Sequence, residues 1–326
     1  MSIDAMQRKL NCVEFGDCRQ IMRRWAEEGV KVQMCVTSPP YYGLRDYGHE
    51  GQIGLEQTPE EYIAAMVEVF RCVRDVLADD GTVWLNIGDS YASFRDGKAT
   101  PDTTRGDDIG TLVPKGSATN RMASTFRNSG IKHKDLIGIP WMLAFALRTD
   151  GWYLRQDIIW HKPNPMPESV RDRCTKAHEY VFLLSKSERY FFNAEAIKVP
   201  ARSKSEGIRF GGGKYGDNDD PKFATKSGNV SKEYEMANRR SVWPISTRPY
   251  NGAHFATMPP ELAELCILAG SRIGDVVLDP FMGSGTTAMV ATELQRKHLG
   301  CELNPAYKPL QDERLSNTQV QLAGFV

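Results

Sequence analysis

A nine-residue loop constrains the fold of this 326-residue chain more than any other feature: D-P-F-M-G-S-G-T-T, from Asp279 to Thr287. The loop follows a short apolar run, Val276 to Leu278, and leads into a predicted helix from Thr286 to Leu294. A predicted strand from His298 to Cys301 completes a β-α-β unit. Such units indicate an α/β fold with a mainly parallel sheet. Ligands of these sheets bind at the carboxyl ends of strands, and this loop begins at one such end.

A second loop of the same kind lies near the amino terminus. The apolar run from Val32 to Val36 predicts a buried strand that ends at T-S-P-P-Y-Y, residues Thr37 to Tyr42. Two prolines stop the strand and feed the chain into a loop. Both unusual loops therefore follow strands at their carboxyl ends, where a ligand is expected.

The next helix has a well-marked start. Thr58 is a natural N-cap, Pro59 suits the first turn, and Glu61 completes a capping box. Asp80-Gly81 is the predicted end of this helix, and Thr82 to Ile87 is the predicted strand that follows. Further segments complete a doubly wound, mainly parallel sheet: a helix from Pro140 to Leu147, a helix from Pro259-Pro260 to Gly270, and strands Leu154 to Trp160 and Tyr180 to Leu184.

The glycines of the first loop indicate a nucleotide-like ligand. Gly283 and Gly285 lie where backbone must approach a ligand closely, and φ > 0 is open to them. A phosphate-binding loop would place a lysine after Gly285, and none is present. In the dinucleotide fingerprint a third glycine would stand at Ala288, although alanine is tolerated there. The spacing alone does not choose between such ligands.

Glu302 narrows the choice of ligand. It ends the strand that follows, about 20 residues beyond the loop, where a carboxylate can accept hydrogen bonds from ribose hydroxyls. The alternative is a plain surface carboxylate. A cofactor that has a ribose but no phosphate fits a loop without a phosphate-binding lysine, and S-adenosylmethionine is such a molecule.

The segment Ser38-Pro39-Pro40-Tyr41 is suited to holding a flat amine. Two prolines fix φ twice, so the carbonyls around Ser38 and Pro39 point in set directions and can accept from a planar NH₂ group. Tyr41 offers a flat face on which an extruded base could stack. The alternative is a proline-stiffened turn with tyrosines in the core.

Basic charge is concentrated in two irregular stretches. Arg95 to Lys134 holds eight basic and four acidic residues, and Lys198 to Arg240 holds ten and six. Each stretch carries +4, and because the whole chain is neutral the remainder carries −8. Solvated loops would explain either stretch alone, but the pair beside the two motif regions favours contact with a polyanion.

Other features of the sequence limit the classes of protein. The seven cysteines are scattered singly without a C-x-x-C pair, so we expect no metal site and small buried thiols. No apolar run is long enough to span a membrane, and the first residues lack the apolar stretch of a signal peptide. These features predict a cytoplasmic protein.

The pairing of T-S-P-P-Y-Y with D-P-F-M-G-S-G-T-T resembles the amino-methyltransferases of DNA, which act on cytosine N4 or adenine N6. Because the catalytic loop precedes the cofactor loop, the order is similar to that of the permuted beta group. The resemblance covers most of the chain. Phe15 to Cys18 resembles the short G-D-C segment of the family, and His254 to Pro259 resembles the segment before the helix beside the cofactor.

The resemblance implies a Rossmann-like, permuted methyltransferase fold, with S-adenosylmethionine as cofactor and double-stranded DNA as partner. It implies a catalytic domain of residues 1–197 and 241–326, a target recognition region at 198–240, and a flexible basic insertion at 95–134. The implied catalytic residues are Ser38, Pro39, Pro40 and Tyr41. The implied cofactor-binding residues are Asp17, Cys18, Thr37, Phe255, Asp279, Pro280, Phe281, Gly283, Ser284, Gly285, Thr286, Thr287 and Glu302.

The base and the physiological setting stay open at this point. Serine at the first position of the catalytic tetrad usually accompanies cytosine N4 in the family, so we expect cytosine N4, with adenine N6 as the alternative. An RNA amino-methyltransferase, a phosphate-loop nucleotide hydrolase and an inactive methyltransferase core are further alternatives. The chain is expected to be a monomer or homodimer, either in a restriction-modification pair or as an orphan enzyme. Trp160, His161 and Lys162 border the same cleft either as DNA-facing residues or as part of a packed turn.

Overall fold

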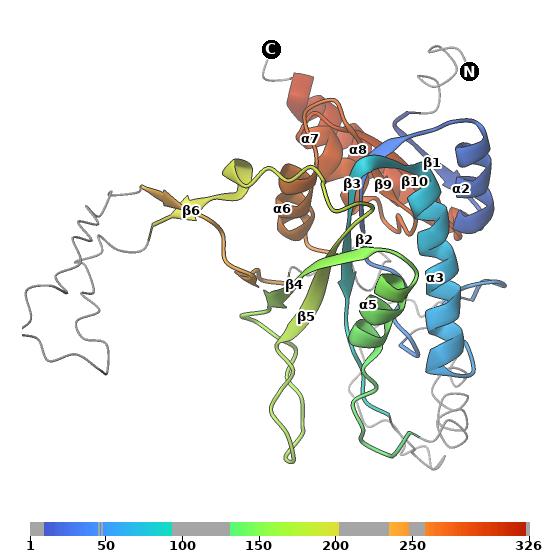
Figure 1. Cartoon of the computed structure of the whole chain (residues 1–326), viewed down its shortest axis with the longest axis vertical. Helices are drawn as coiled ribbons and strands as arrows, with labels where there is room; N and C mark the ends of the chain where they lie inside the picture. Colours follow the sequence, from blue (N-terminus) through green and yellow to red (C-terminus); the bar gives the residue numbers. More distant parts are fainter. Residues whose placement is uncertain are drawn as a thin grey trace, which may run out of the picture. The chain divides into compact units, whose positions relative to one another are not determined.

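The computed structural model describes residues 10–44, 46, 48–92, 131–201, 235–247 and 258–323 (Figure 1). The chain divides into two compact units, one formed by 1–193 with 241–326 and the other by Ala194–Arg240. Most of the predicted insertion 95–134 and the middle of the predicted recognition region 198–240 lie outside the described residues. In the described residues, no helix is both long and apolar enough to cross a membrane.

Strands and helices alternate along the larger unit. Its strands are β1 Cys12–Phe15, β2 Val32–Thr37, β3 Leu77–Ile87, β4 Tyr153–His161, β5 His178–Ser185, β8 Val242–Pro244, β9 Val276–Asp279 and β10 Lys297–Glu302. Its helices are α2 Cys18–Glu27, α3 Pro59–Val76, α5 Ile139–Thr149, α6 Pro260–Gly270, α7 Thr286–Glu293 and α8 Lys308–Ala323, with a 3-10 turn η3 at Pro305–Tyr307. The smaller unit contains a 3-10 turn, η1 Glu195–Ile197, and an antiparallel pair of short strands, β6 Val199–Pro200 and β7 Met236–Ala237.

The eight strands of the larger unit form one sheet in the order β1-β10-β9-β2-β3-β5-β4-β8. Every neighbouring pair is parallel except those that include β5, which runs antiparallel to β3 and β4. Helices α2, α3 and α5 cover one face of this sheet, and α6 and α7 cover the other, with α8 packed against α7 (Figure 1). The prediction of a doubly wound, mainly parallel α/β fold is confirmed.

Helix α3 begins as the sequence predicts but ends earlier. The Thr58 hydroxyl accepts from the Glu61 amide at 3.1 Å, and the Glu61 carboxylate accepts from the Thr58 amide at 3.2 Å. The helix stops at Val76, so the predicted end at Asp80-Gly81 is wrong. Leu77 is already extended, with φ −76° and ψ 141°, and opens β3.

A bulge explains the difference. Leu77 pairs with Val32, and the register then shifts until Thr82 pairs with Met34, so the residues between them are extra on the β3 side. Gly81 belongs to this bulge, where an added Cβ would lie 2.8 Å from the Gln33 carbonyl oxygen. Leu77 is fully buried, and helical spacing cannot distinguish a buried leucine at the end of a helix from one at the start of a strand.

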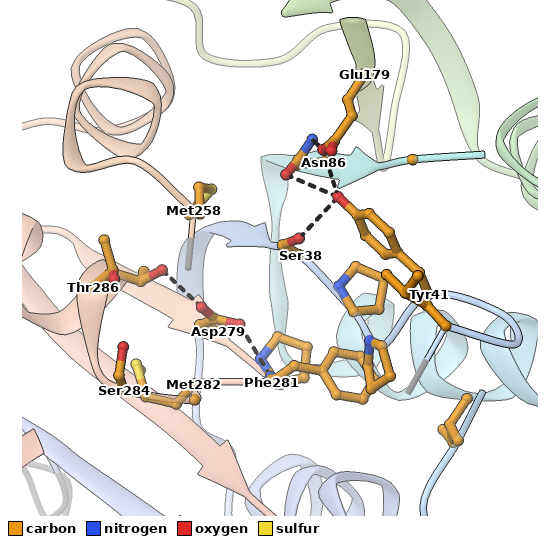
Figure 2. Close-up of a pocket in the computed structure, with 18 of the residues that line it drawn as sticks. Ser38, Tyr41, Asn86, Glu179, Met258, Asp279, Phe281, Met282, Ser284 and Thr286 are labelled. Carbon is orange, nitrogen blue, oxygen red and sulfur yellow. Dashed lines mark hydrogen bonds between the residues drawn. The ribbon is translucent and has the colours of Figure 1, made fainter. Parts of the chain in front are cut away.

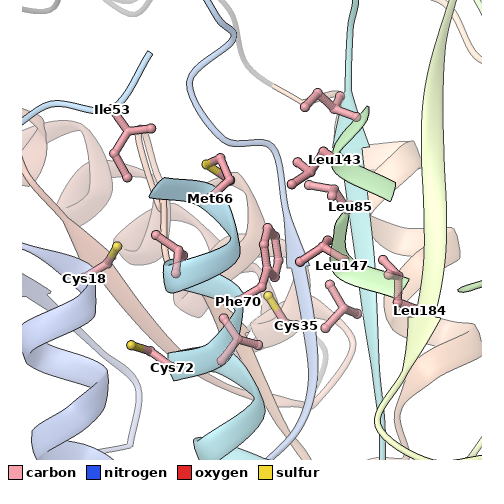
Figure 3. Close-up of a cluster of buried hydrophobic side chains, with 14 of the residues drawn as sticks. Cys18, Cys35, Ile53, Met66, Phe70, Cys72, Leu85, Leu143, Leu147 and Leu184 are labelled. Atoms are coloured by element: carbon pink, nitrogen blue, oxygen red, sulfur yellow. The ribbon is translucent and has the colours of Figure 1, made fainter. Parts of the chain in front are cut away.

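The core between the sheet and α3 is apolar and contains several thiols. Met66 and Phe70 of α3 face the sheet next to Cys35, and both side chains are fully buried (Figure 3). Cys18 and Cys72 lie in the same cluster. Burial raises the pKa of the Cys35 thiol, which stays protonated and packs as a small apolar group.

Candidate active site

Five parallel strands end at one pocket. The pocket has a volume of about 1280 Å³, and residues at or just after the carboxyl ends of β1, β10, β9, β2 and β3 line it. The antiparallel strand β5 begins at the same edge and contributes Glu179, while Lys162 follows the end of β4. This is the edge at which a parallel sheet is expected to bind its ligand.

The two loops singled out in the sequence lie side by side because β2 and β9 are neighbours in the sheet. The Thr37 hydroxyl at the end of β2 donates to Asp279 Oδ1 at the end of β9, over 2.6 Å. These residues are 242 positions apart in the chain. The fold thus joins the Ser-Pro-Pro-Tyr loop and the glycine-rich loop into one site (Figure 2).

Asp279 is a buried carboxylate without a cation. Besides the bond from Thr37, it accepts from the Phe281 amide at 3.0 Å and from the Thr287 hydroxyl at 2.7 Å. Its exposed fraction is 4%, and burial raises its pKa in spite of these three donors. No lysine, arginine or histidine within the described ranges forms an ion pair with it. Such a carboxylate favours a ligand that brings positive charge.

Glu302 holds the glycine-rich loop from the neighbouring strand. Its Oε2 accepts from the Gly283 amide at 2.7 Å, and its Oε1 accepts from the Asn304 amide at 2.8 Å. Burial raises its pKa, which the backbone amides only partly offset. Each carboxylate oxygen has a further lone pair, so the group can still accept from a ligand hydroxyl in the pocket that it lines. The alternative of a plain surface carboxylate at Glu302 is therefore excluded.

Two residues of helix α8 donate hydrogen bonds to the glycine-rich loop. Gln311 Nε2 donates to the Gly283 carbonyl at 2.7 Å, and Arg314 Nη1 donates to the Thr286 hydroxyl at 2.6 Å. Gly285 is left-handed, with φ +86°, and packs against Gln311. No local sequence pattern identified Gln311 or Arg314 as part of the site.

One hydroxyl in the loop has no partner. Ser284 lines the pocket with an exposed fraction of 2%, and its Oγ has no hydrogen-bond partner among the described residues. Buried polar atoms are nearly always hydrogen bonded, so this hydroxyl is available to pair with a ligand that enters the pocket.

The segment after β1 forms the far wall of the pocket. Asp17 caps helix α2 by accepting from the Arg19 amide at 2.8 Å, and the Arg19 guanidinium lowers the pKa of this carboxyl. Cys18 also lines the pocket, and burial raises the pKa of its thiol to about 12, which excludes a thiolate nucleophile.

The Ser-Pro-Pro-Tyr loop is held by tyrosines. The Tyr62 hydroxyl of α3 donates to the Pro40 carbonyl at 2.9 Å, which turns that oxygen toward the core. The Tyr41 hydroxyl donates to Glu179 Oε2 at 2.6 Å, and the Ser38 hydroxyl lies 3.5 Å from the Tyr41 hydroxyl. The loop is thus more than a stiff turn, because its serine and tyrosine belong to a polar network at the pocket.

Sequence reasoning missed two members of this network and left a third open. Asn86 of β3, Glu179 of β5 and Lys162 line the pocket around Tyr41. The sequence did offer a sign of Asn86, which is the polar residue in the otherwise apolar run from Val83 to Ile87 and has an exposed fraction of 2%. For Lys162 the sequence allowed either a DNA-facing role or a packed turn. Its neighbour Trp160 is buried and donates to the Ile245 carbonyl at 2.8 Å, so the tryptophan packs within the protein.

Most of the predicted site residues meet at the pocket. Thr37 and Gly285 stand immediately beside it, and Phe255 lies outside the described residues. The residues that line it are Asp17, Cys18, Ser38, Pro39, Pro40, Tyr41, Asp279, Pro280, Phe281, Gly283, Ser284, Thr286, Thr287 and Glu302. Their individual roles stay predictions.

Known proteins resemble this chain over nearly its whole length. A family model described as DNA methylase, N6_N4_Mtase, matches residues 32–313. The Type II methyltransferase M.SmaI of Serratia marcescens is 47% identical over 321 residues, which cover 96% of this chain and 97% of that protein. The Type II methyltransferase M.Cfr9I of Citrobacter freundii is 44% identical over 300 residues, with 92% and 86% covered.

Solved structures share the fold at lower identity. A PvuII DNA methyltransferase described as cytosine-N4-specific matches with a TM-score of 0.58 and 18% identity, over 94% of this chain and 88% of the other. A DNA modification methylase of Thermus thermophilus that is described as putative, in complex with S-adenosyl-L-methionine, matches with a TM-score of 0.55 and 24% identity, over 94% and 93%. At these identities the structures support the fold alone.

Proposed function

The chain belongs to the N6/N4 DNA methylase family as an S-adenosylmethionine-dependent Type II DNA methyltransferase, and from this premise we propose that its target is the N4 amine of cytosine. The observation that carries the choice of base is Ser38, which stands first in the catalytic tetrad and whose hydroxyl lies at the pocket within a hydrogen-bonded network. A hydroxyl can accept from the amine of the base and can also donate.

The residues of the glycine-rich half fit S-adenosylmethionine. Asp279 supplies negative charge for a cofactor that carries a sulfonium and an ammonium group, and Glu302 supplies acceptors for the ribose hydroxyls. The unpaired Ser284 hydroxyl gains a partner when the pocket is filled. Asp17 lines the same pocket, and its place in a segment that resembles the G-D-C segment of the family assigns it to the adenine of the cofactor. When bound, the cofactor supplies an electrophilic methyl group.

On the opposite side, Ser38 and the Pro39 carbonyl hold the reacting amine. An exocyclic amine is a poor nucleophile because its lone pair is conjugated with the ring. Hydrogen bonds from the amine to these two oxygens draw the nitrogen toward sp³ geometry and stabilise the positive charge that develops on it. Tyr41 bounds the same pocket and provides a face for the extruded base.

Two basic segments are proposed to contact DNA. Residues 198–240 are assigned to target recognition, and their described ends carry Lys198, Arg239 and Arg240. The insertion 95–134 is assigned to phosphate contacts. The described residues near its two ends are paired with each other: the Ala92 amide donates to the Asp135 carbonyl and the Lys134 amide donates to the Ala92 carbonyl, both at 2.9 Å.

The experiment is transfer of labelled methyl from S-adenosylmethionine to mixed-sequence duplex DNA, followed by digestion to nucleosides and mass spectrometry. N4-methylcytosine supports the proposal. N6-methyladenine overturns the choice of base but leaves the family, fold and cofactor unchanged. Absence of labelled DNA, with cofactor binding shown by calorimetry and an RNA substrate run in parallel, would overturn DNA as the substrate.

A further inference from the structure

Glu179 lies where three elements meet around the catalytic tyrosine. It stands near the start of β5 and faces Tyr41 of the catalytic loop and Asn86 of β3 (Figure 2). Lys162, which follows β4, is its third neighbour. Its Oε2 accepts from the Tyr41 hydroxyl at 2.6 Å and from Asn86 Nδ2 at 3.2 Å, while its Oε1 forms an ion pair with Lys162. The side chain is 14% exposed, so water competes little for these bonds.

The direction of each hydrogen bond follows from a count of hydrogens. An ionised carboxylate only accepts, so the single hydroxyl proton of Tyr41 points to Glu179. Burial, and then the negative charge of Glu179, raise the pKa of Tyr41 well above its ordinary value, so the tyrosine keeps that proton. The lone pairs of the Tyr41 oxygen are then left to accept.

Asn86 does not supply the donor that the Tyr41 oxygen needs. Both hydrogens of its amide are committed, one to Glu179 and one to the Tyr180 carbonyl at 3.2 Å. Its Oδ1 therefore faces the Tyr41 hydroxyl, at 3.4 Å, and is itself an acceptor. The remaining neighbour is the Ser38 hydroxyl at 3.5 Å, a long contact of the kind that tightens when substrate binds.

We infer that Glu179 is a positioning residue that fixes the hydrogen-bonding direction of Ser38. With the Tyr41 proton directed to Glu179, the Ser38 proton is directed to Tyr41, and the Ser38 lone pairs face the substrate amine as acceptors. The inference rests on the proposed function, because it requires an amine that donates to Ser38. It adds to that function a residue from another strand, 138 positions away from Tyr41 in the chain.

A purely structural role for Glu179 would be as counter-ion. Lys162 pairs with it directly, and Lys176 and His178 are the other titratable groups near it on the same edge. In that role, replacing Glu179 would leave Lys162 without its partner, and the damage would not depend on the Tyr41 hydroxyl. The two roles therefore predict different coupling between substitutions at Glu179 and at Tyr41 in their effect on kcat.

The test is a double-mutant cycle with Glu179→Gln and Tyr41→Phe, measured as kcat, DNA KM and cofactor affinity. The glutamine amide can donate to the Tyr41 oxygen, which frees the tyrosine proton to point at Ser38 and makes Ser38 a donor to the pocket. We expect Glu179→Gln to lower kcat by about 10- to 100-fold with KM and cofactor affinity changed by less than about twofold. In the Tyr41→Phe background the same change should alter kcat by less than about twofold, because no hydroxyl remains to be reoriented.

Two further variants keep the test interpretable. Glu179→Asp retains an acceptor-only group and should recover more of kcat than the glutamine variant. Lys162→Met removes the ion pair and leaves the carboxylate. The inference is wrong if Lys162→Met and Glu179→Gln lower kcat by the same factor. It is also wrong if Glu179→Gln still lowers kcat in the Tyr41→Phe background. N6-methyladenine from the wild-type protein would overturn the base assignment without affecting this cycle, so the two failures are distinguishable.

Discussion

The two halves of the pocket are built in different ways. In the cofactor half, Asp279 and Glu302 are held by backbone amides and threonine hydroxyls over 2.6 to 3.0 Å. In the base half, Glu179 holds the Tyr41 hydroxyl at 2.6 Å, but Ser38 and Asn86 approach that hydroxyl only over 3.4 to 3.5 Å. The cofactor half is fixed by the sheet and the glycine-rich loop, whereas the base half is completed by side chains that still have room to tighten.

The difference also concerns charge. Asp279 is a carboxylate without a cation partner in the described part of the chain, whereas Glu179 already pairs with Lys162. The cofactor half thus has unbalanced negative charge, and the base half is balanced before substrate arrives. This predicts that the cofactor half binds a cation strongly and that the base half selects by hydrogen-bond direction.

The largest effect is expected from Asp279. Asp279→Ala removes the acceptor for Thr37, Thr287 and the Phe281 amide, and we expect cofactor affinity to fall by about 100-fold and the free energy of unfolding by about 3 kcal/mol. Asp279→Asn is the matched control, because it keeps the shape and one acceptor oxygen. It should unfold no more easily than wild type yet bind S-adenosylmethionine about tenfold more weakly by calorimetry. Wild-type affinity in the asparagine variant would contradict the charge argument.

The next prediction concerns two serines, one in each half of the pocket, each of which is replaced by alanine. Ser38→Ala should lower kcat by about 100-fold with unchanged cofactor affinity, because the lost acceptor acts only on the reacting amine. Ser284→Ala should weaken cofactor binding by about fivefold with little change in kcat, since it deletes a hydroxyl that only the cofactor pairs. Single-turnover methylation and calorimetry measure the two quantities. Loss of cofactor affinity in Ser38→Ala would mean that the halves are not separate.

A smaller effect is expected from the backbone of the cofactor loop. Gly285 is left-handed, and an added Cβ would lie 3.3 Å from Gln311, so Gly285→Ala should cost about 1–2 kcal/mol of unfolding free energy and weaken cofactor binding. Gly274 has nearly the same φ, +84°, with nothing within 4 Å of the added Cβ. Gly274→Ala should therefore cost the backbone strain alone and leave the cofactor affinity intact. Urea unfolding and calorimetry compare the two, and equal effects on affinity would refute the role of the loop.

The smallest expected effect is a pH dependence of the free energy of unfolding that arises from Glu302. Burial raises its pKa above the ordinary value, so its contribution to stability is greatest below that ordinary value and is lost as the pH rises through the raised one. We expect the free energy of unfolding of wild type, relative to Glu302→Gln, to decrease as the pH rises from about 4 to about 7. Denaturant titrations at several pH values measure this difference, and a constant difference would show that Glu302 is not perturbed.

Local motifs were predictable from the sequence because their geometry is local. The capping box of Thr58 and Glu61 and the turn at Gly285 depend on residues within a few positions, and both occur as predicted. The predicted end of α3 was wrong because a β-bulge, which depends on pairing with β2, overrides the helical pattern at Leu77. Pairing between strands cannot be read from the spacing of apolar residues within one segment.

The supporting residues of the site were not predictable for the same reason. Glu179 reaches Tyr41 from 138 positions away, and Gln311 reaches Gly283 from 28 positions away on a later helix. A lone glutamate or glutamine has no distinctive spacing. The strand order, which sets β5 beside β3, brings Glu179 to the site, and the packing of α8 against α7 brings Gln311.

The neighbourhood of β2 and β9 has a consequence for synthesis on the ribosome. The catalytic loop emerges early, but the strand that stands next to β2 and carries Asp279 is made 242 residues after Thr37, and β1 has no neighbour in the sheet until β10 is made. A nascent chain that has not reached Glu302 therefore holds an incomplete pocket with open strand edges. Chains that terminate before this point lack β10 and its carboxylate, so we expect methylation only from chains that are translated past Glu302.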